Sequence, residues 1–177
     1  MRSDIWKRIK ASRIPLFRIS GIQVNLDYSW FVIFALVTWS LSAGYFPLHS
    51  DEMSSTERWM AGLVTSLLFF FSIVLHEMAH SLVALRAGLS IKAITLYIFG
   101  GASHLDTEPK TPRTEFTIAI AGPVASLTLG VLLHAARIMM AHGRASTAAA
   151  VLYFLTWINL SIGIFNLVPG FPLDGGR

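Results

Sequence analysis

The chain has 177 residues, of which 54% are hydrophobic and only 14% are charged, and its formal net charge is +4. Because a soluble domain carries roughly 25% charged residues, this composition excludes an ordinary soluble protein and predicts an integral membrane protein. The absence of cysteine also excludes disulfides, thiolate metal sites and thiol catalysis, so any metal must be held by His, Asp or Glu.

The N-terminal arm, residues 1–27, holds six of the basic residues together with scattered apolar side chains. Lys and Arg gather on the cytosolic side of membrane proteins, and a weakly amphipathic basic segment can lie along the membrane surface. We therefore predict a basic cytosolic arm at 1–27 and a transmembrane core at 28–177. The same bias accounts for the positive charge of the chain, so no nucleic-acid partner is expected.

Four apolar stretches are long enough to cross a bilayer, at about residues 28–46, 59–86, 115–140 and 147–168. The second ends in a basic residue followed by a helix-stopping glycine, Arg86-Ala87-Gly88. In the topology with a cytosolic N-terminus, most Lys and Arg residues fall on the inner side, as the positive-inside rule requires. The sequence thus predicts an all-α polytopic, multi-pass membrane protein with about four transmembrane helices.

The second stretch contains His76-Glu77-Met78-Ala79-His80, and Glu77 is the only formally charged residue between Trp59 and Leu85. Residues four apart lie on the same face of an α-helix, so both imidazoles can converge on one point with Glu77 beside them. This is the H-E-x-x-H arrangement of zinc hydrolases. Ionisable residues inside a membrane are rare and usually functional, which favours a metal site over two alternatives, a structural polar cluster and a proton relay.

A period-two pattern follows the second span, in which Ile94, Leu96 and Ile98 alternate with polar or aromatic residues up to Gly100-Gly101. Such alternation predicts a strand, and the glycine pair can turn it into a short β-hairpin. Unpaired strand edges are not tolerated in lipid, so we expect the hairpin to face protein, water or a peptide near the active site. It either connects two helices or pairs with an extended substrate by edge addition.

The fourth span does not end as an ordinary helix does. After Asn166 the chain enters residues 169–176, which contain two prolines and three glycines and cannot remain helical. In the predicted topology this segment reaches the depth of His76 and His80, where Asp174 can supply a third ligand. Two imidazoles and one carboxylate leave one position of zinc open, as in catalytic sites. The alternative is a plain loop with a solvated aspartate.

Together, the H-E-x-x-H stretch and the run from Asn166 to Gly176 resemble the site-2 protease family of intramembrane zinc metalloproteases. The second run matches the family form N-x-x-P-x-x-P-L-D-G-G without a gap. Residues 17–46 are also similar to the subgroup that carries CBS domains after the membrane core, and no such domains are present here. Since the family continues with at least one further helix, we expect that the chain is truncated after this motif.

The resemblance implies a zinc ion held by His76, His80 and Asp174, with Glu77 as general base and then general acid. It also implies that Asn166 helps to bind or polarise the scissile carbonyl. The expected function is hydrolysis of peptide bonds within or near transmembrane segments of membrane-bound regulatory proteins, in the plasma (inner) membrane of a prokaryote. A substrate segment must be locally unwound, and the residues expected to hold it are Ile94, Leu96, Ile98, Gly100, Gly101 and Asn166.

Two other functions could use the same polar cluster. A metal-ion or proton transporter would need a continuous polar path, whereas the outer half of the second span offers only the hydroxyls of Thr65, Ser66 and Ser72. An inactive homologue could serve as a membrane binding module, but the intact Glu77 argues against it. The expected partners are thus a transmembrane protein substrate and the lipid bilayer, and a homodimer is left open.

Overall fold

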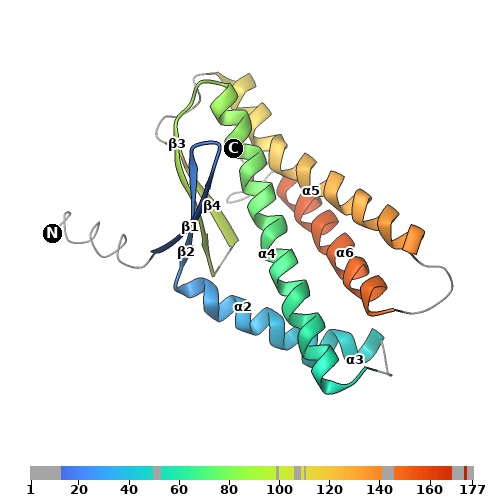
Figure 1. Cartoon of the computed structure of the whole chain (residues 1–177). Coiled ribbons are helices and arrows are strands. Elements are labelled where there is room, and N and C mark those ends of the chain that lie inside the picture. The colour runs from blue at the N-terminus through green and yellow to red at the C-terminus, as the bar shows by residue number, and fades with distance from the viewer. Residues whose placement is uncertain are drawn as a thin grey trace.

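The computed structural model describes residues 13–49, 53–98, 100–105, 109, 111–140, 146–168 and 174, without the side chains of 104 and 105. Residues 1–12 of the predicted arm, Phe99 and most of the C-terminal motif therefore lie outside the described residues. In chain order the elements are β1 Arg13–Ile19, β2 Ile22–Asp27, α2 Ser29–Ser40, the π-helical segment η1 Leu41–Tyr45, α3 Phe46–His49, α4 Ser55–Arg86, β3 Ile91–Tyr97, β4 Gly100–Leu105, α5 Pro112–Met140 and α6 Thr147–Leu167 (Figure 1).

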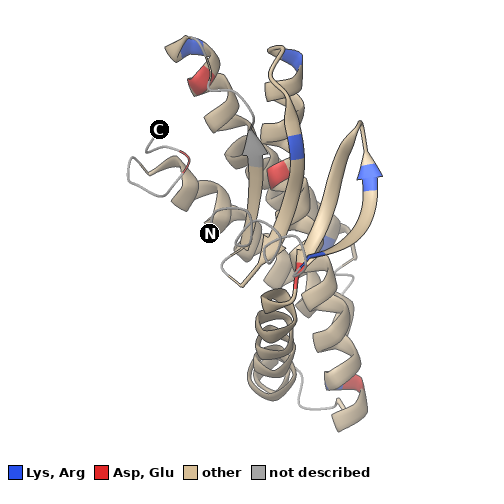
Figure 2. Ribbon diagram, turned by 90° about the vertical axis from the view of Figure 1, so that its left-hand side faces the viewer, with Lys and Arg blue, Asp and Glu red and all other residues tan. Residues whose placement is uncertain are grey.

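Four helical segments in the described part of the chain are long and apolar enough to cross a membrane, as predicted. The first, Ser29–His49, consists of α2, η1 and α3 in succession. α4 lies in the centre, with α2 on one side of it and α5 and α6 on the other (Figure 1). Charged residues lie mainly on the strands and at helix ends (Figure 2), so most of the helical surface is apolar.

α4 is 32 residues long, about 48 Å at 1.5 Å per residue. Its start is fixed by a capping box, in which the Ser54 hydroxyl accepts from the Glu57 amide and the Glu57 carboxylate accepts from the Ser54 amide at 2.8 Å. Its end is followed by Gly88, which has φ +80°, as expected of a helix-stopping glycine. The sequence predicted that this helix begins at about Trp59, where the apolar run begins. The helix in fact begins at Ser55, because the capping box lies before the apolar run.

The strands form one four-stranded sheet in the order β1-β2-β3-β4, with antiparallel outer pairs and a parallel β2–β3 pair. β3 and β4 are the predicted hairpin. β1 and β2 were missed by the sequence analysis. They are joined by the turn Ser20-Gly21, with φ 51° and 82°, the type I′ geometry that matches the twist of a hairpin. β2 then pairs with β3 across two membrane spans, with Val24 opposite Ile94.

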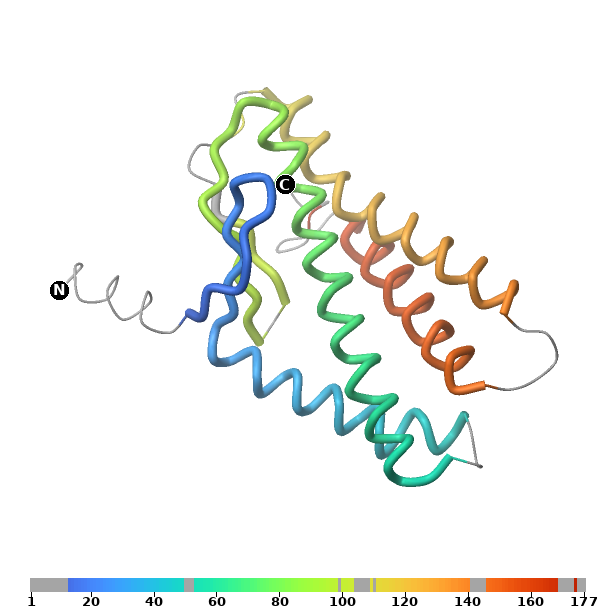
Figure 3. Tube along the Cα trace, viewed as in Figure 1, coloured from blue at the N-terminus to red at the C-terminus, as the bar shows by residue number. Residues whose placement is uncertain are grey.

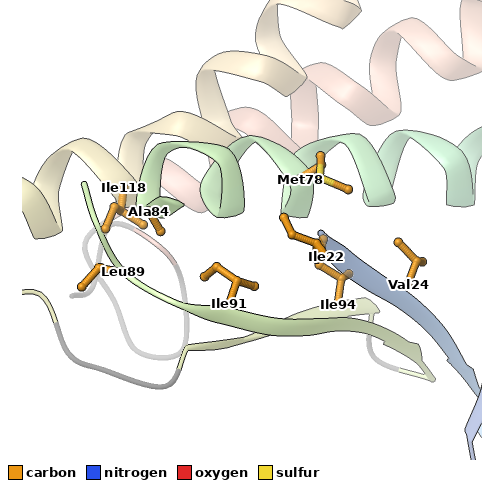
Figure 4. Packing of buried hydrophobic residues seen from close by; sticks show 8 residues of the cluster. All are labelled: Ile22, Val24, Met78, Ala84, Leu89, Ile91, Ile94 and Ile118. Carbon is orange, nitrogen blue, oxygen red and sulfur yellow. The ribbon is translucent and has the colours of Figure 1, made fainter. Parts of the chain in front are cut away.

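The sheet packs on the C-terminal half of α4 through a buried hydrophobic cluster (Figure 4). Ile22 and Val24 of β2 and Ile94 of β3 are almost fully buried in it, together with Met78 of α4. A second cluster continues the contact from the sheet to α2. Each such side chain contributes about 1.5–3 kcal/mol when it is fully buried. The half of α4 that the sheet covers is the half that carries residues 76–80.

α5 and α6 run antiparallel side by side (Figure 3) and pack closely at two glycines. A Cβ at Gly130 would lie 2.8 Å from side-chain atoms of Leu160, and a Cβ at Gly163 would lie 2.7 Å from Leu127. Small residues of this kind let membrane helices approach one another. The position of α5 along the bundle is therefore set by its fit against α6.

Replacing Ile22 by Ala should destabilise the protein by about 2–5 kcal/mol, because it leaves a cavity in a packed cluster in which Ile22 is 1% exposed. The matched control is Ile19→Ala, on the other side of the same turn, where the side chain is 47% exposed. Thermal unfolding in detergent micelles, followed by circular dichroism, measures both variants. Equal effects of the two substitutions would contradict the packing of β2 on α4.

Candidate active site

The site is built on the C-terminal half of α4, which carries both histidines on one face. His76 and His80 are 5% and 7% exposed, and their ring centroids are 4.8 Å apart. Their Nε2 atoms lie 3.1 Å from each other, as expected for residues one helical turn apart whose side chains share a face. The helix thus presents two nitrogen ligands to one point.

Asp174 brings a carboxylate from the C-terminal segment to the two imidazoles. Its Oδ2 atom lies 3.1 Å from Nε2 of His76 and 3.2 Å from Nε2 of His80. Burial opposes ionisation of this carboxyl, whereas hydrogen bonds from the two histidines, and their charge when they are protonated, lower its pKa well below the usual value. A carboxylate binds a metal in its ionised form and an imidazole in its neutral form.

The three ligand atoms form a nearly equilateral triangle that fits a tetrahedral metal ion. With metal–ligand distances of about 2.0–2.1 Å, two ligand atoms of a tetrahedral site are about 3.3–3.4 Å apart, close to the 3.1 and 3.2 Å found here. Two imidazole nitrogens and one carboxylate oxygen are a donor set that zinc takes in catalytic sites. Among the described residues, His76, His80 and Asp174 are the one group of three such side chains placed to hold an ion.

α5 contacts the second nitrogen of each imidazole. Nδ1 of His76 lies 2.9 Å from the hydroxyl of Ser126, and Nδ1 of His80 lies 2.7 Å from the carbonyl oxygen of Ile118. Between these contacts, a Cβ at Gly122 would overlap Nε2 of His80 and lie 2.7 Å from Nε2 of His76. From the sequence, Gly122 is a small residue that allows close helix contact, and the structure shows such contact with the two histidines. Ser126 and the carbonyl of Ile118 were missed, because no pattern of side chains marks either group as a partner of an imidazole.

Glu77 lies beside the ligands at the wall of a cavity of about 470 Å³. β4 covers its side chain, since a Cβ at Gly101 would lie only 3.1 Å from Cδ of Glu77. Asn166, in the last turn of α6, lines the same cavity, and its Nδ2 donates to the Ile162 carbonyl at 3.0 Å. The cavity thus brings together a carboxylate, an amide and two of the three ligand side chains.

A second cavity, of about 200 Å³, shares its lining at Glu77 and Gly101 with the first. The first cavity is walled mainly by apolar side chains of α4 and α6. The second lies toward the start of α5 and includes the polar side chains of Ser81 and Glu115. Glu77 therefore stands between an apolar space and a more polar one.

The substrate-binding residues predicted on the hairpin occupy different environments. Ile94 and Leu96 are 0% and 3% exposed and pack in the two hydrophobic clusters, so their side chains face the core and not the cavity. Ile98 is half-buried, and Gly100 and Gly101 line the cavity. β3 is paired on both sides, by β2 and β4, so among the described strands the sheet edges belong to β1 and β4.

Replacing Gly122 by Ala should weaken metal binding by at least about 10–100-fold, because the new Cβ meets the metal-facing nitrogens of both histidines. The control is Gly44→Ala, where a Cβ has no atom within 4 Å. Zinc content of the detergent-purified protein, measured by mass spectrometry, compares the two. A Gly122→Ala protein that retains its full zinc content would show that α5 does not approach the ligands in this way.

The chain matches peptidase family M50 over residues 64–142 and 135–177. It is 42% identical over 165 residues to Rip3 of Mycobacterium tuberculosis, a protein named provisionally as a zinc metalloprotease. The aligned region covers 93% of the chain and 42% of Rip3. It is 37% identical over 164 residues to zinc metalloprotease MJ0392 of Methanocaldococcus jannaschii, covering 93% and 43%. The chain therefore spans less than half the length of these relatives.

The fold is similar to a solved structure, that of the site-2 protease from Methanocaldococcus jannaschii. The TM-score is 0.65 at 34% sequence identity, and the match covers 93% of this chain and 68% of the other. The family match itself covers more than half of the chain and includes most of α4, all of α5 and α6, and Asp174. The chain therefore belongs to peptidase family M50, the family of site-2 proteases.

Proposed function

We propose that this chain carries the catalytic part of an intramembrane zinc metallopeptidase that hydrolyses peptide bonds in transmembrane segments of regulatory proteins. The observation that carries the proposal is the meeting of two imidazoles and one carboxylate at 3.1 and 3.2 Å, beside Glu77 and among apolar helices. Membership of a peptidase family supports the reaction type, and four apolar helices support a membrane location.

Each polar side chain of the site has a role in this hydrolysis. A zinc ion held by His76, His80 and Asp174 would supply Lewis acidity, which polarises a peptide carbonyl and makes water a stronger nucleophile. Glu77 would accept the proton of the attacking water and donate it to the leaving amine. The close contact with Gly101 restricts the rotamers of Glu77 and holds its carboxylate near the ligands.

The larger cavity suits a hydrophobic substrate segment. Its walls include Phe69 and Ile73 of α4 and Ile158 and Ile162 of α6. Asn166 lies in the same cavity and has two amide N–H groups. One of them donates to the carbonyl of Ile162, and we infer that the second donates to the scissile carbonyl.

A transmembrane helix must unwind locally before it can be cut, since its carbonyls are engaged in internal hydrogen bonds. An unwound segment needs new partners for its backbone when it lies among apolar helices. Within the described part of the chain, β4 is the edge strand of the sheet on the side of the cavity, which Gly100 and Gly101 line. We infer that the substrate pairs with β4 by edge addition.

We further propose that the sheet and the open end of the site lie on the cytosolic side of a prokaryotic plasma membrane. Arg86 and Arg113 lie at the helix ends near the sheet, whereas Arg58 lies at the opposite end of α4, and the positive-inside rule assigns the more basic end to the cytosol. All of the proposed ligands and catalytic residues come from one chain, so the reaction does not require a homodimer.

Transport of a metal ion or protons is not favoured by the contacts of the outer half of α4. The hydroxyls of Thr65, Ser66 and Ser72 donate to carbonyls of their own helix at 2.7, 2.8 and 2.7 Å. These groups satisfy the helix backbone and are not arranged as a path toward the ligands.

The substitution Glu77→Gln should abolish peptide hydrolysis and leave zinc bound, because it removes the proton acceptor and none of the ligands. His76→Ala and Asp174→Ala should both lose the zinc. The measurements are zinc content and cleavage of a fluorogenic transmembrane substrate in vesicles by the full-length protein. Hydrolysis that persists in Glu77→Gln would exclude the proposed role of this residue, and wild-type protein without zinc would exclude the proposed function.

Asn166→Ala should lower kcat by about 10²–10³-fold if its amide stabilises the developing oxyanion, by analogy with loss of one such donor in other hydrolases. Zinc content should not change, since Asn166 is not among the three ligands. Steady-state kinetics with the same substrate separates kcat from KM. A change confined to KM would assign Asn166 to substrate binding alone.

A further inference from the structure

The metal-facing histidines are held from behind by a single face of α5. Ile118, Gly122 and Ser126 are spaced four residues apart, so they lie in one row along the helix. The first provides a carbonyl oxygen at 2.7 Å from Nδ1 of His80, and the last provides a hydroxyl at 2.9 Å from Nδ1 of His76. Gly122, between them, brings the backbone of α5 against both Nε2 atoms.

The contact with Ile118 decides which nitrogen of His80 carries the proton. A carbonyl oxygen only accepts hydrogen bonds, so Nδ1 of His80 must donate, and Nε2 of the neutral ring, the form that binds a metal, then presents a lone pair. The hydroxyl of Ser126 can donate or accept. For His76 to present a lone pair from Nε2 in the same way, its Nδ1 must donate and the oxygen of Ser126 must accept.

Ser126 is well placed to act as that acceptor. It is 2% exposed, and its neighbours in the adjoining space between α4 and α5 are mainly hydrophobic. The close fit of α5 on α6 at Gly130 and Gly163 fixes the position of α5 and hence of the hydroxyl. A buried N–H that loses its acceptor in such surroundings costs about 1–3 kcal/mol.

We propose that Ser126 is a positioning residue for the metal site: it accepts a hydrogen bond from Nδ1 of His76 and thereby sets the tautomer and orientation of that ligand. With Ile118 and Gly122 it makes one face of α5 the support of both imidazoles. The inference rests on the proposed zinc site, and it adds a residue outside both sequence motifs. Partners of this kind typically change metal affinity by about 10–100-fold when they are removed.

The test is the zinc affinity of the full-length protein in detergent, measured by competition with a chromophoric chelator. Ser126→Ala should bind zinc about 10–100-fold more weakly, whereas Ser126→Thr, which keeps the hydroxyl, should restore affinity close to wild type. The space beside Ser126, about 380 Å³, has room for the added methyl group. The matched control is Ser72→Ala, a buried serine one turn before His76 whose hydroxyl donates to the Phe69 carbonyl of its own helix.

A second readout separates positioning from general loss of packing. Cobalt(II) bound in place of zinc reports the ligand geometry through its visible absorption, since geometry is diagnostic for such ions. Ser126→Ala should shift this spectrum, and Ser72→Ala and Ser126→Thr should not. Unchanged affinity and spectrum in Ser126→Ala would overturn the proposal. So would equal losses of affinity in Ser126→Ala and Ser72→Ala.

The outcome is distinguishable from failure of the peptidase proposal because no peptide substrate is used. Wild-type protein that binds zinc and cleaves no substrate would remove the proposed function, while the affinity difference at Ser126 would stand. Conversely, active wild-type protein with an unaltered zinc affinity in Ser126→Ala would leave the function in place and remove the role of Ser126.

Discussion

Two imidazoles and a carboxylate can be buried among apolar helices only if their polar atoms have partners, because an unpaired buried group costs several kcal/mol. Here the outer nitrogen of each histidine reaches α5. The ligand atoms converge at 3.1 and 3.2 Å, where a metal ion would be the partner of all three. This requirement explains why α5 must lie so close to α4 at the level of the site.

Two glycines from different elements allow neighbouring backbone to approach the H-E-x-x-H turn closely. Gly122 lets α5 approach the ligand nitrogens, and Gly101 lets β4 approach Glu77. Neither position tolerates a Cβ without movement of a functional side chain. Packing of the sheet on α4 holds Gly101 in place, and packing of α6 on α5 holds Gly122 in place.

The elements that local patterns specify were predictable from the sequence. The spacing of His76 and His80 is a property of one helix, and the glycine after α4 marks its end. Asp174 could be assigned because the topology of the spans places the C-terminal segment at the same depth. The position of β3 also follows from local alternation, although its side chains Ile94 and Leu96 turned out to face the core.

The features that sequence analysis missed depend on contacts between distant segments. β2 pairs in parallel with β3 about 70 residues later, and nothing in the sequence of β2 names that partner. Its own residues do carry a strand pattern, because three buried apolar side chains alternate with polar ones: Ile22, Val24 and Leu26. That alternation and the turn Ser20-Gly21 were the local signs of the N-terminal hairpin, and the sequence analysis instead assigned the segment to a basic arm because of its charges. The hydroxyl of Ser126 and the carbonyl of Ile118 acquire their partners only when α5 is packed on α4.

The chain order of these parts bears on how the protein is made. β2 leaves the ribosome before the first two spans, and its partner β3 follows them, so the β2–β3 pair can form only after both spans have been synthesised. Asp174 is synthesised after all four spans. A partly made chain therefore holds the helix with Glu77 without the covering strand or the third ligand. Newly inserted fragments should therefore take up little metal until synthesis has passed Asp174.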